Sequence, residues 1–212
     1  MKGYTMDKSK KFVITIARQF GTGGHEIGEE IAKRLGVKLI DKQILTAVAE
    51  KLRITPEKAA RLDEKRPSWW DDFAVFYRAF ADSTTYSGNE RELTSRQMFN
   101  AQAAEIKAIA RHESCVVIGR CGFYLFADTP NTVRIFLHAD RQARLTRIMQ
   151  IYNTDERKAR QMMEEHDYGR EIYTKDMTGK TWNDATNYDL CLDITPYSTQ
   201  TATDLLMEYI NK

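Results

Sequence analysis

The chain has 212 residues, of which 42% are hydrophobic and 29% are charged. This length and composition argue against a disordered chain and predict a single globular domain over residues 1–212 with a hydrophobic core. The formal net charge is +2, from 32 basic and 30 acidic residues, so no global field favours a nucleic-acid partner. No segment approaches the length of a membrane-spanning helix, so we expect no membrane partner.

The cysteines indicate a reducing compartment. Cys115, Cys121 and Cys191 are an odd number, and two of them lie in or beside apolar runs. Reduced, buried thiols explain this usage better than disulfides do. Because disulfides are rare in the cytosol, we expect a cytoplasmic protein.

Short apolar runs alternate with helical patterns along the chain. They cover residues 12–17, 37–40, 115–118, 133–138 and 190–194. Their apolarity is continuous rather than alternating, which is typical of parallel strands covered on both faces by helices. The sequence therefore predicts a three-layer α/β fold around a five-stranded parallel sheet.

The first strand and the first helix enclose a glycine-rich loop. Residues 24–35 are predicted to be helical, because Ile27, Ile31 and Leu35 recur at a spacing of four and Gly36 follows as a stop. The preceding residues 18–26 read RQFGTGGHE. A glycine-rich turn between a strand and a helix directs backbone N–H groups at an anion near the positive end of the helix. We therefore expect the loop to bind a nucleotide phosphate.

The side chains of this loop depart from the common phosphate-binding pattern G-x-x-x-x-G-K-S/T. Arg18 stands at the first glycine, Gly23 matches the second, Gly24 replaces the lysine, and His25 replaces the hydroxyl that binds Mg²⁺. Thr22 is out of register for that hydroxyl. Phosphoryl transfer needs cations on the charge that develops in the transition state, so what the chain can do depends on whether another residue supplies the missing one.

A long, mostly helical excursion over residues 42–113 separates the second and third strands and exceeds what a crossover needs. Thr94 and Ser95 are predicted to cap one of its helices. Core packing or a homodimer interface explains its aromatic band at helical spacing better than stacking on a base. The band consists of Trp69, Trp70, Phe73, Phe76, Tyr77 and Phe80.

Arginines gather on the helical segment after the fourth strand. Asp140 is predicted to cap a helix that carries Arg141, Arg144 and Arg147 on its polar side, and Thr154 to cap the next helix. Arginines on a helix usually form a solvated face. Beside a phosphate loop they have a second interpretation, as a lid that closes over the transferring phosphates.

Four segments, in this order and spacing, resemble the cytidylate kinase-like family of bacterial proteins. They are IARQFGTGGHEIG at 16–28, LIDKQIL at 39–45, CVVIGRC at 115–121 and NYDLCLD at 187–193. The resemblance spans nearly the whole chain and implies the P-loop NTPase fold of nucleoside-monophosphate kinases. It implies a helical monophosphate-binding insertion at about 42–113 and a helical lid at about 152–184.

The resemblance also implies roles for residues beyond the loop. Asp41, after the second strand, matches the acidic residue near the acceptor phosphate in cytidylate kinases. Lys107 stands near the position where those enzymes present a basic residue to the monophosphate. Arg120 matches the arginine of a Gly-Arg-Asp turn. Asp167 and Arg170 resemble the acid and arginine pair of the lid. We therefore expect Asp41, Lys107 and Asp167 to bind the acceptor.

The donor side is expected to bind ATP and Mg²⁺. Arg18 is the first candidate for the missing cation, and Arg120 and Arg170 are the others. Glu26 is the candidate Mg²⁺ ligand, although a carboxylate in the first helical turn is ordinarily a cap. The ATP phosphates are expected to contact the backbone of Gly21, Thr22, Gly23, Gly24 and His25.

The sequence thus predicts a small-molecule nucleotide as the partner. Its resemblance implies a nucleoside-monophosphate kinase that transfers the γ-phosphoryl group of ATP to a pyrimidine monophosphate such as CMP or dCMP. Two alternatives remain: a nucleotide-binding regulatory protein that has lost the transfer reaction, and a kinase of another small acceptor. The altered loop favours the regulatory protein, whereas the set of arginines favours an enzyme.

Overall fold

A computed structural model of the chain describes residues 6–41 and 88–211, without the side chains of 88–95, 97 and 98. The chain divides into two compact units, Met1–Asp41 with Ala108–Lys212 and Lys42–Lys107. The aromatic band expected at residues 69–80 lies outside the described residues. Within the described ranges, no helix combines the length and the apolar character that a membrane span requires.

The first unit is built on the expected parallel sheet. Its strands run in the order β2-β3-β1-β4-β5, and every neighbouring pair is parallel. This arrangement confirms the predicted α/β class. The strands are β1 (Val13–Arg18), β2 (Lys38–Ile40), β3 (Cys115–Ile118), β4 (Thr132–His138) and β5 (Leu190–Asp193).

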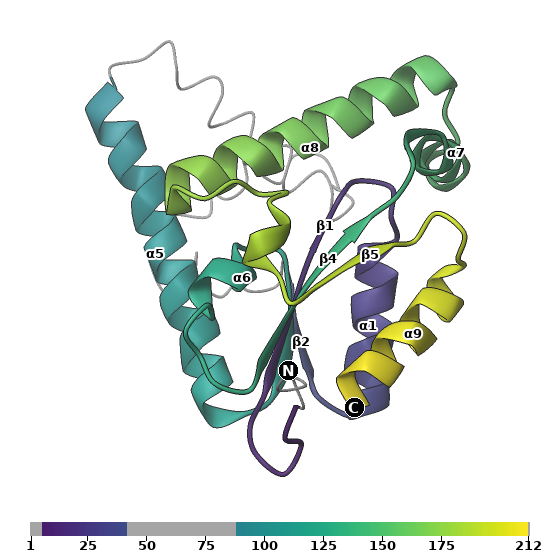
Figure 1. The fold of residues 1–212 in the computed structure, drawn as a ribbon. Coiled ribbons are helices and arrows are strands. Elements are labelled where there is room, and N and C mark those ends of the chain that lie inside the picture. Colours follow the sequence, from purple (N-terminus) through teal and green to yellow (C-terminus); the bar gives the residue numbers. More distant parts are fainter. Residues whose placement is uncertain (1–5, 42–87, 212) are drawn as a thin grey trace. The chain divides into compact units, whose positions relative to one another are not determined.

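Helices connect the strands and cover the sheet, and Figure 1 shows α1 and α9 side by side on one face. On that face Ile14 and Ile16 of β1 pack with Ile27 and Ile31 of α1 and with Leu206 of α9, all of them buried. The helices are α1 (Gly24–Leu35), α5 (Gly88–His112), α6 (Gly122–Leu125), α7 (Arg141–Tyr152), α8 (Glu156–Thr178) and α9 (Thr199–Asn211).

The helix boundaries confirm some predicted caps and correct others. Asp140 caps α7, because its carboxylate accepts hydrogen bonds from the backbone N–H groups of Gln142 and Ala143. The prediction for α8 was wrong by one residue, since Asp155 rather than Thr154 is the cap and accepts from Lys158 N at 2.7 Å. Thr94 and Ser95 do not cap α5 but lie inside it, because these residue types are only mildly unfavourable in a helix.

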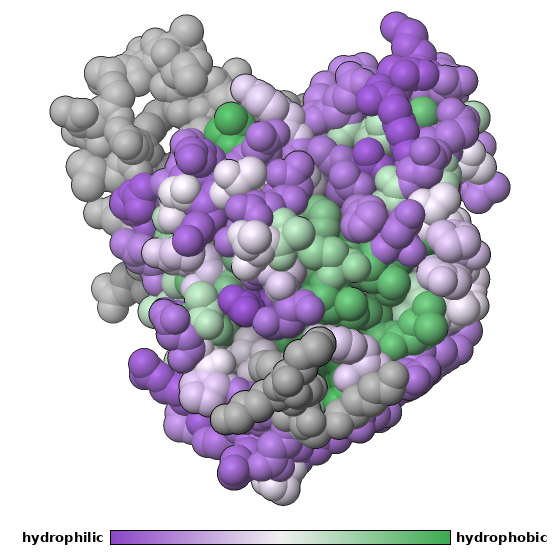
Figure 2. All heavy atoms as spheres, in the orientation of Figure 1, coloured by the Kyte–Doolittle hydropathy of each residue, from purple (hydrophilic) through white to green (hydrophobic). Residues whose placement is uncertain are grey.

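All three cysteines are free thiols, of which Cys115 and Cys121 are buried and Cys191 is exposed. Burial raises the pKa of Cys115 to about 12 and that of Cys121 to about 12, so both are protonated at neutral pH. Cys191 is exposed because it lies on β5, the edge strand. Figure 2 shows apolar side chains gathered over β5 and α9, whereas the outer faces of α7 and α8 are mostly hydrophilic.

Gly28 brings α1 close to the sheet, and this contact makes a first prediction. A Cβ at Gly28 would lie 2.7 Å from Cδ1 of Ile118 and 3.2 Å from Cδ1 of Ile16, both fully buried. Overpacking costs about 1–3 kcal/mol, and the higher helix propensity of alanine returns about 1. We expect Gly28→Ala to lower the free energy of unfolding by about 1 kcal/mol in urea denaturation.

The matched control is Glu29→Ala, which changes an exposed residue of the same helix. It should stay within about 0.5 kcal/mol of the unmodified protein. A Gly28→Ala protein as stable as the control would show that α1 does not pack this tightly.

Candidate active site

The loop between β1 and α1 has a backbone that suits an anion. Gly21 (φ 83°) and Gly23 (φ 74°) both adopt left-handed conformations, which glycine accommodates without strain. Thr22 is fully buried, and its hydroxyl donates to the carbonyl of Gln19 at 2.8 Å. The Thr22 side chain therefore closes the loop, and the loop's remaining means of binding phosphate are its backbone and the start of α1.

The side chain of Arg18 crosses this loop. A Cβ at Gly24 would lie 2.8 Å from Cγ of Arg18, and a Cβ at Gly119 would lie 2.4 Å from its Nη1. The side chain thus runs from Gly24, where the usual lysine would start, to Gly119 at the end of β3. Position 24 accepts no side chain while Arg18 is in place, so the two departures from the loop pattern complement each other.

Positive charge accumulates around Arg18. Burial and the charges of Arg170 and Arg120 together lower the pKa of Arg18 to about 9, against the opposing effects of Asp41 and Asp167. Burial also lowers the pKa of Arg170 to about 10, although Asp167 opposes that shift. Both guanidinium groups remain charged at neutral pH, so an anion that binds beside them relieves their repulsion.

Arg120 is held in a strained turn at the end of β3. Gly119 (φ 68°), Arg120 (φ 52°) and Cys121 (φ 53°) are consecutive left-handed residues, and Gly122 N donates to the Gly119 carbonyl at 2.8 Å. A non-glycine residue in this conformation costs about 1–2 kcal/mol. Such strain is found mainly where function requires it. Here it places Arg120 at the carboxyl end of the parallel strands, where open α/β folds bind ligands.

Asp41 lies at the same carboxyl end of the sheet, directly after β2, where it meets the start of α1. Its Oδ2 is 3.1 Å from Nδ1 of His25. Burial raises the pKa of Asp41, but the hydrogen bond from His25 and the charges of Arg18 and Arg120 outweigh burial and hold the pKa below its ordinary value. Asp41 is therefore ionised at neutral pH, near two arginines, and its contact with an acceptor stays a prediction.

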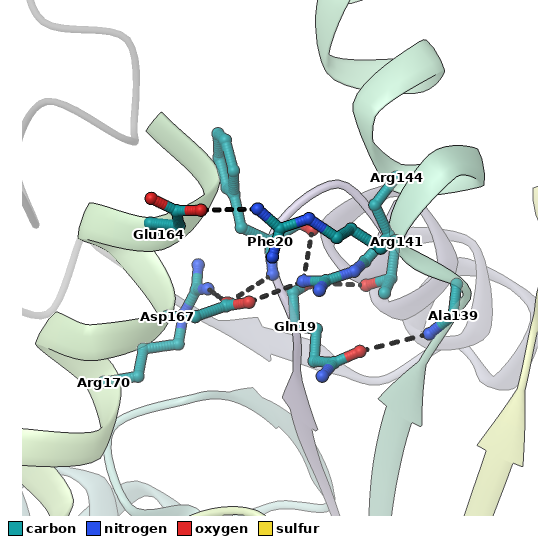
Figure 3. A network of polar contacts seen from close by, with 9 residues as sticks. Gln19, Phe20, Ala139, Arg141, Arg144, Glu164, Asp167 and Arg170 are labelled. Carbon is teal, nitrogen blue, oxygen red and sulfur yellow. Dashed lines mark hydrogen bonds and ion pairs between the residues drawn. The ribbon is translucent and has the colours of Figure 1, made fainter. Parts of the chain in front are cut away.

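Asp167 fastens α8 to the loop, as Figure 3 shows. Its carboxylate accepts hydrogen bonds from Phe20 N at 2.8 Å, from Nη1 of Arg170 at 2.9 Å, and from Nη1 of Arg144. Arg144 also donates to the carbonyl of Phe20 at 3.3 Å. Helices α7 and α8 thus hold both backbone polar groups of Phe20. These contacts make Asp167 a positioning residue, and its contact with an acceptor stays a prediction.

Phe20 belongs to the site although the sequence did not single it out, and Arg144, predicted only as one of three arginines on the polar side of its helix, belongs to it as well. The Phe20 ring is fully buried, with its centroid 4.3 Å from that of His166 and 5.9 Å from Cζ of Arg170. Arg144 is buried as well. A large aromatic residue inside a glycine-rich loop was the available signal for Phe20, but its partner lies 147 positions away in sequence.

Two predicted residues have other surroundings than expected. Oε1 of Glu26, the candidate Mg²⁺ ligand, lies 3.1 Å from Nη2 of Arg147. Among the described residues, no group of three or more His, Cys, Asp and Glu side chains is placed to hold a metal ion. Lys107 is exposed on α5 and belongs to the second unit, so its position relative to the loop is not described. Both roles stay predictions.

The sheet has this strand order and a glycine-rich loop between β1 and α1, and the chain has the fold of the P-loop kinases. A sequence profile of the cytidylate kinase-like family matches residues 13–196. The chain therefore belongs to the cytidylate kinase-like family.

Solved structures agree with this fold. An uncharacterised protein from Eubacterium ventriosum is 25% identical, with a TM-score of 0.70 over 95% of this chain and 99% of that one. Shikimate kinase from Bacteroides thetaiotaomicron is 12% identical, with a TM-score of 0.51 over 95% of this chain and 99% of that one, which shows a shared fold alone. No curated protein matches the chain.

The lowered pKa of Arg18 makes a prediction about pH. Anion affinity should be complete below pH 9 and fall as pH rises through about 9, because Arg18 then loses its proton. The phosphates of ATP are already fully ionised in this range, since their last pKa is about 6. The measurement is a calorimetric titration with ATP between pH 7 and 10.5. The control is Arg18→Gln, which should bind ATP more weakly and with an affinity that does not change as pH rises through 9. If the affinity of the unmodified protein is equally independent of pH, this role of Arg18 is wrong.

Proposed function

We propose that the chain is a nucleoside-monophosphate kinase that transfers the γ-phosphoryl group of ATP to a pyrimidine monophosphate such as CMP or dCMP. The observation that carries this proposal is the course of the Arg18 side chain. The side chain starts where the first glycine usually stands, fills the space from which the usual lysine would extend, and brings its guanidinium to Gly119 at the end of β3. Family membership supports the acceptor class.

The donor half of the proposal rests on the loop. Two left-handed glycines and the positive end of α1 suit a phosphate chain, and the buried guanidinium groups of Arg18 and Arg170 add positive charge beside the loop. In this proposal the triphosphate of ATP is the anion that binds there. Arg18 binds the phosphates that flank the bond to be broken, and Arg170 stabilises the transferred group, as cations do in phosphoryl transfer.

The acceptor half rests on Arg120 and Asp41, which lie at the ends of β3 and β2. Arg120 makes no ion pair with a residue in the described ranges, so its guanidinium is available for the acceptor phosphate. Asp41 orients the acceptor from the neighbouring strand end. When bound, Mg²⁺ would supply positive charge to the phosphates; Glu26, the ligand that the sequence predicted, is paired with Arg147. The free cysteines support a cytoplasmic location.

One observation favours a second candidate, a regulatory protein that binds nucleotide without transferring phosphate. The lysine position holds Gly24, and the Thr22 hydroxyl is used inside the loop. A loop that keeps its amides but loses its cation would bind ATP and do little chemistry.

A direct assay separates the two. Purified protein is incubated with Mg-ATP and a panel of nucleoside monophosphates while the nucleotide products are followed, and ATP binding is measured by calorimetry. We expect ADP with CDP or dCDP as products. Tight ATP binding without product from any acceptor would overturn the kinase and support the regulatory protein, and product from another acceptor alone would overturn the assignment to CMP.

A further inference from the structure

Glu26 and Arg147 form an ion pair on the phosphate loop. Glu26 lies in the first turn of α1 and Arg147 on α7, with 3.1 Å between Oε1 and Nη2. The guanidinium also lies against the loop backbone, because a Cβ at Gly23 would be 2.7 Å from Nη2 and 2.9 Å from Cζ of Arg147. An arginine side chain thus packs against each of two neighbouring glycines: Arg18 against Gly24, and Arg147 against Gly23.

Arg147 has donor capacity beyond its ion pair. Its Nη2 reaches Glu26, whereas its Nε is buried and donates to no acceptor in the described ranges. Its side chain is 30% exposed and that of Glu26 is 47% exposed. Because water screens an ion pair this exposed, the pair is weak and can open at little cost.

A carboxylate and a phosphate compete for the same location here. The positive end of α1 attracts either anion, and the guanidinium of Arg147 binds either one. One carboxylate brings a single negative charge, whereas the triphosphate of a nucleotide brings several. Where phosphate binds the loop, Glu26 therefore acts as an internal anion that must give way.

We propose that the Glu26–Arg147 ion pair is a latch over the phosphate loop, and that the donor nucleotide opens it by taking Arg147 from Glu26. This inference rests on the proposed function, because it requires a nucleotide phosphate at the loop. It assigns Arg147 to the phosphates of the donor and gives Glu26 a role opposite to that of a metal ligand. A metal ligand strengthens binding of Mg-ATP, whereas a latch weakens binding of ATP with or without Mg²⁺.

The test is a calorimetric titration of Glu26→Gln with ATP in the presence and absence of Mg²⁺. The latch predicts that the Kd falls about two- to fivefold in both conditions, which is the range expected from an exposed ion pair. The matched control is Glu164→Gln, which opens the exposed ion pair to Arg141 on α7 and should leave the Kd unchanged. A Kd that rises for Glu26→Gln only with Mg²⁺ would overturn the latch and establish the metal ligand.

A second variant separates the latch from simple charge repulsion. Arg147→Gln should weaken ATP binding by itself, and in this background Glu26→Gln should no longer improve it. If Glu26→Gln improves binding equally in both backgrounds, Glu26 acts by repulsion alone and the latch is wrong. Failure of the unmodified protein to bind ATP would overturn the proposed function instead, so the two failures are distinguishable. Thermal unfolding of each variant confirms that it is folded.

Discussion

Replacement of Arg18 by glutamine is expected to lower phosphoryl transfer by about 10³-fold or more, the contribution of a cation at the transferring phosphate in related reactions. Glutamine keeps much of the side chain that packs over Gly24 but removes the charge. The loop amides remain, so weak ATP binding should persist while turnover is lost. Turnover is measured with Mg-ATP and saturating acceptor, and ATP affinity by calorimetry.

The control for Arg18→Gln is Arg160→Gln, which removes an exposed arginine of α8 that pairs with Glu156. Its turnover should equal that of the unmodified protein. Circular dichroism shows whether each variant is folded. If folded Arg18→Gln keeps full turnover, Arg18 does not replace the lysine, and Arg120 and Arg170 become the candidates.

Asp167→Ala should have the largest effect on stability. The Asp167 carboxylate is the partner of Arg144 and Arg170, both buried, and it accepts the N–H of Phe20. Removing one partner of a buried ion pair costs about 3–5 kcal/mol, because it leaves charge buried without compensation. We expect a loss of this size in the free energy of unfolding, measured by urea denaturation, together with weaker ATP binding as Phe20 is released from α8.

Glu164→Gln is again the matched control, since Glu164 lies on α8 one turn before Asp167 and pairs with Arg141 in solvent. Its effect should stay below about 1 kcal/mol. A loss for Asp167→Ala no larger than that of the control would mean that α7 and α8 are not fastened to the loop through Asp167.

Local patterns predicted most of the fold because the fold follows from local rules. Continuous apolar runs identified the strands, and the period of Ile27, Ile31 and Leu35 with Gly36 identified α1 at its observed boundaries. Continuous apolarity also indicated a parallel sheet with both faces covered, as in the structure. The cap of α8 was misplaced because Thr154 and Asp155 are both good caps, and only the backbone conformation distinguishes them.

The site could be predicted only in part, because its contacts join distant positions. The sequence shows an arginine at position 18 and a glycine at position 24. Only the folded structure shows that the Arg18 side chain occupies the space that a side chain at position 24 would need. Likewise, Asp167 was recognisable as a lid acid, whereas its bond to Phe20 N depends on how α8 meets the loop. The ion pair of Glu26 with Arg147 joins α1 to α7 and has no local signature.

Relative to the usual loop pattern, the glycine and the cationic residue have changed places between positions 18 and 24, and this permits one decisive measurement. Arg18→Gly removes the cation, and Gly24→Lys forces a side chain into Arg18. The double variant restores the first glycine and the lysine of the usual loop pattern, with His25 still in place of the hydroxyl. Phosphoryl transfer from Mg-ATP is compared among the four proteins. We predict that both single variants lose activity and that the double variant recovers well above either. A double variant no more active than the weaker single variant would contradict the claim that Arg18 performs the work of the lysine.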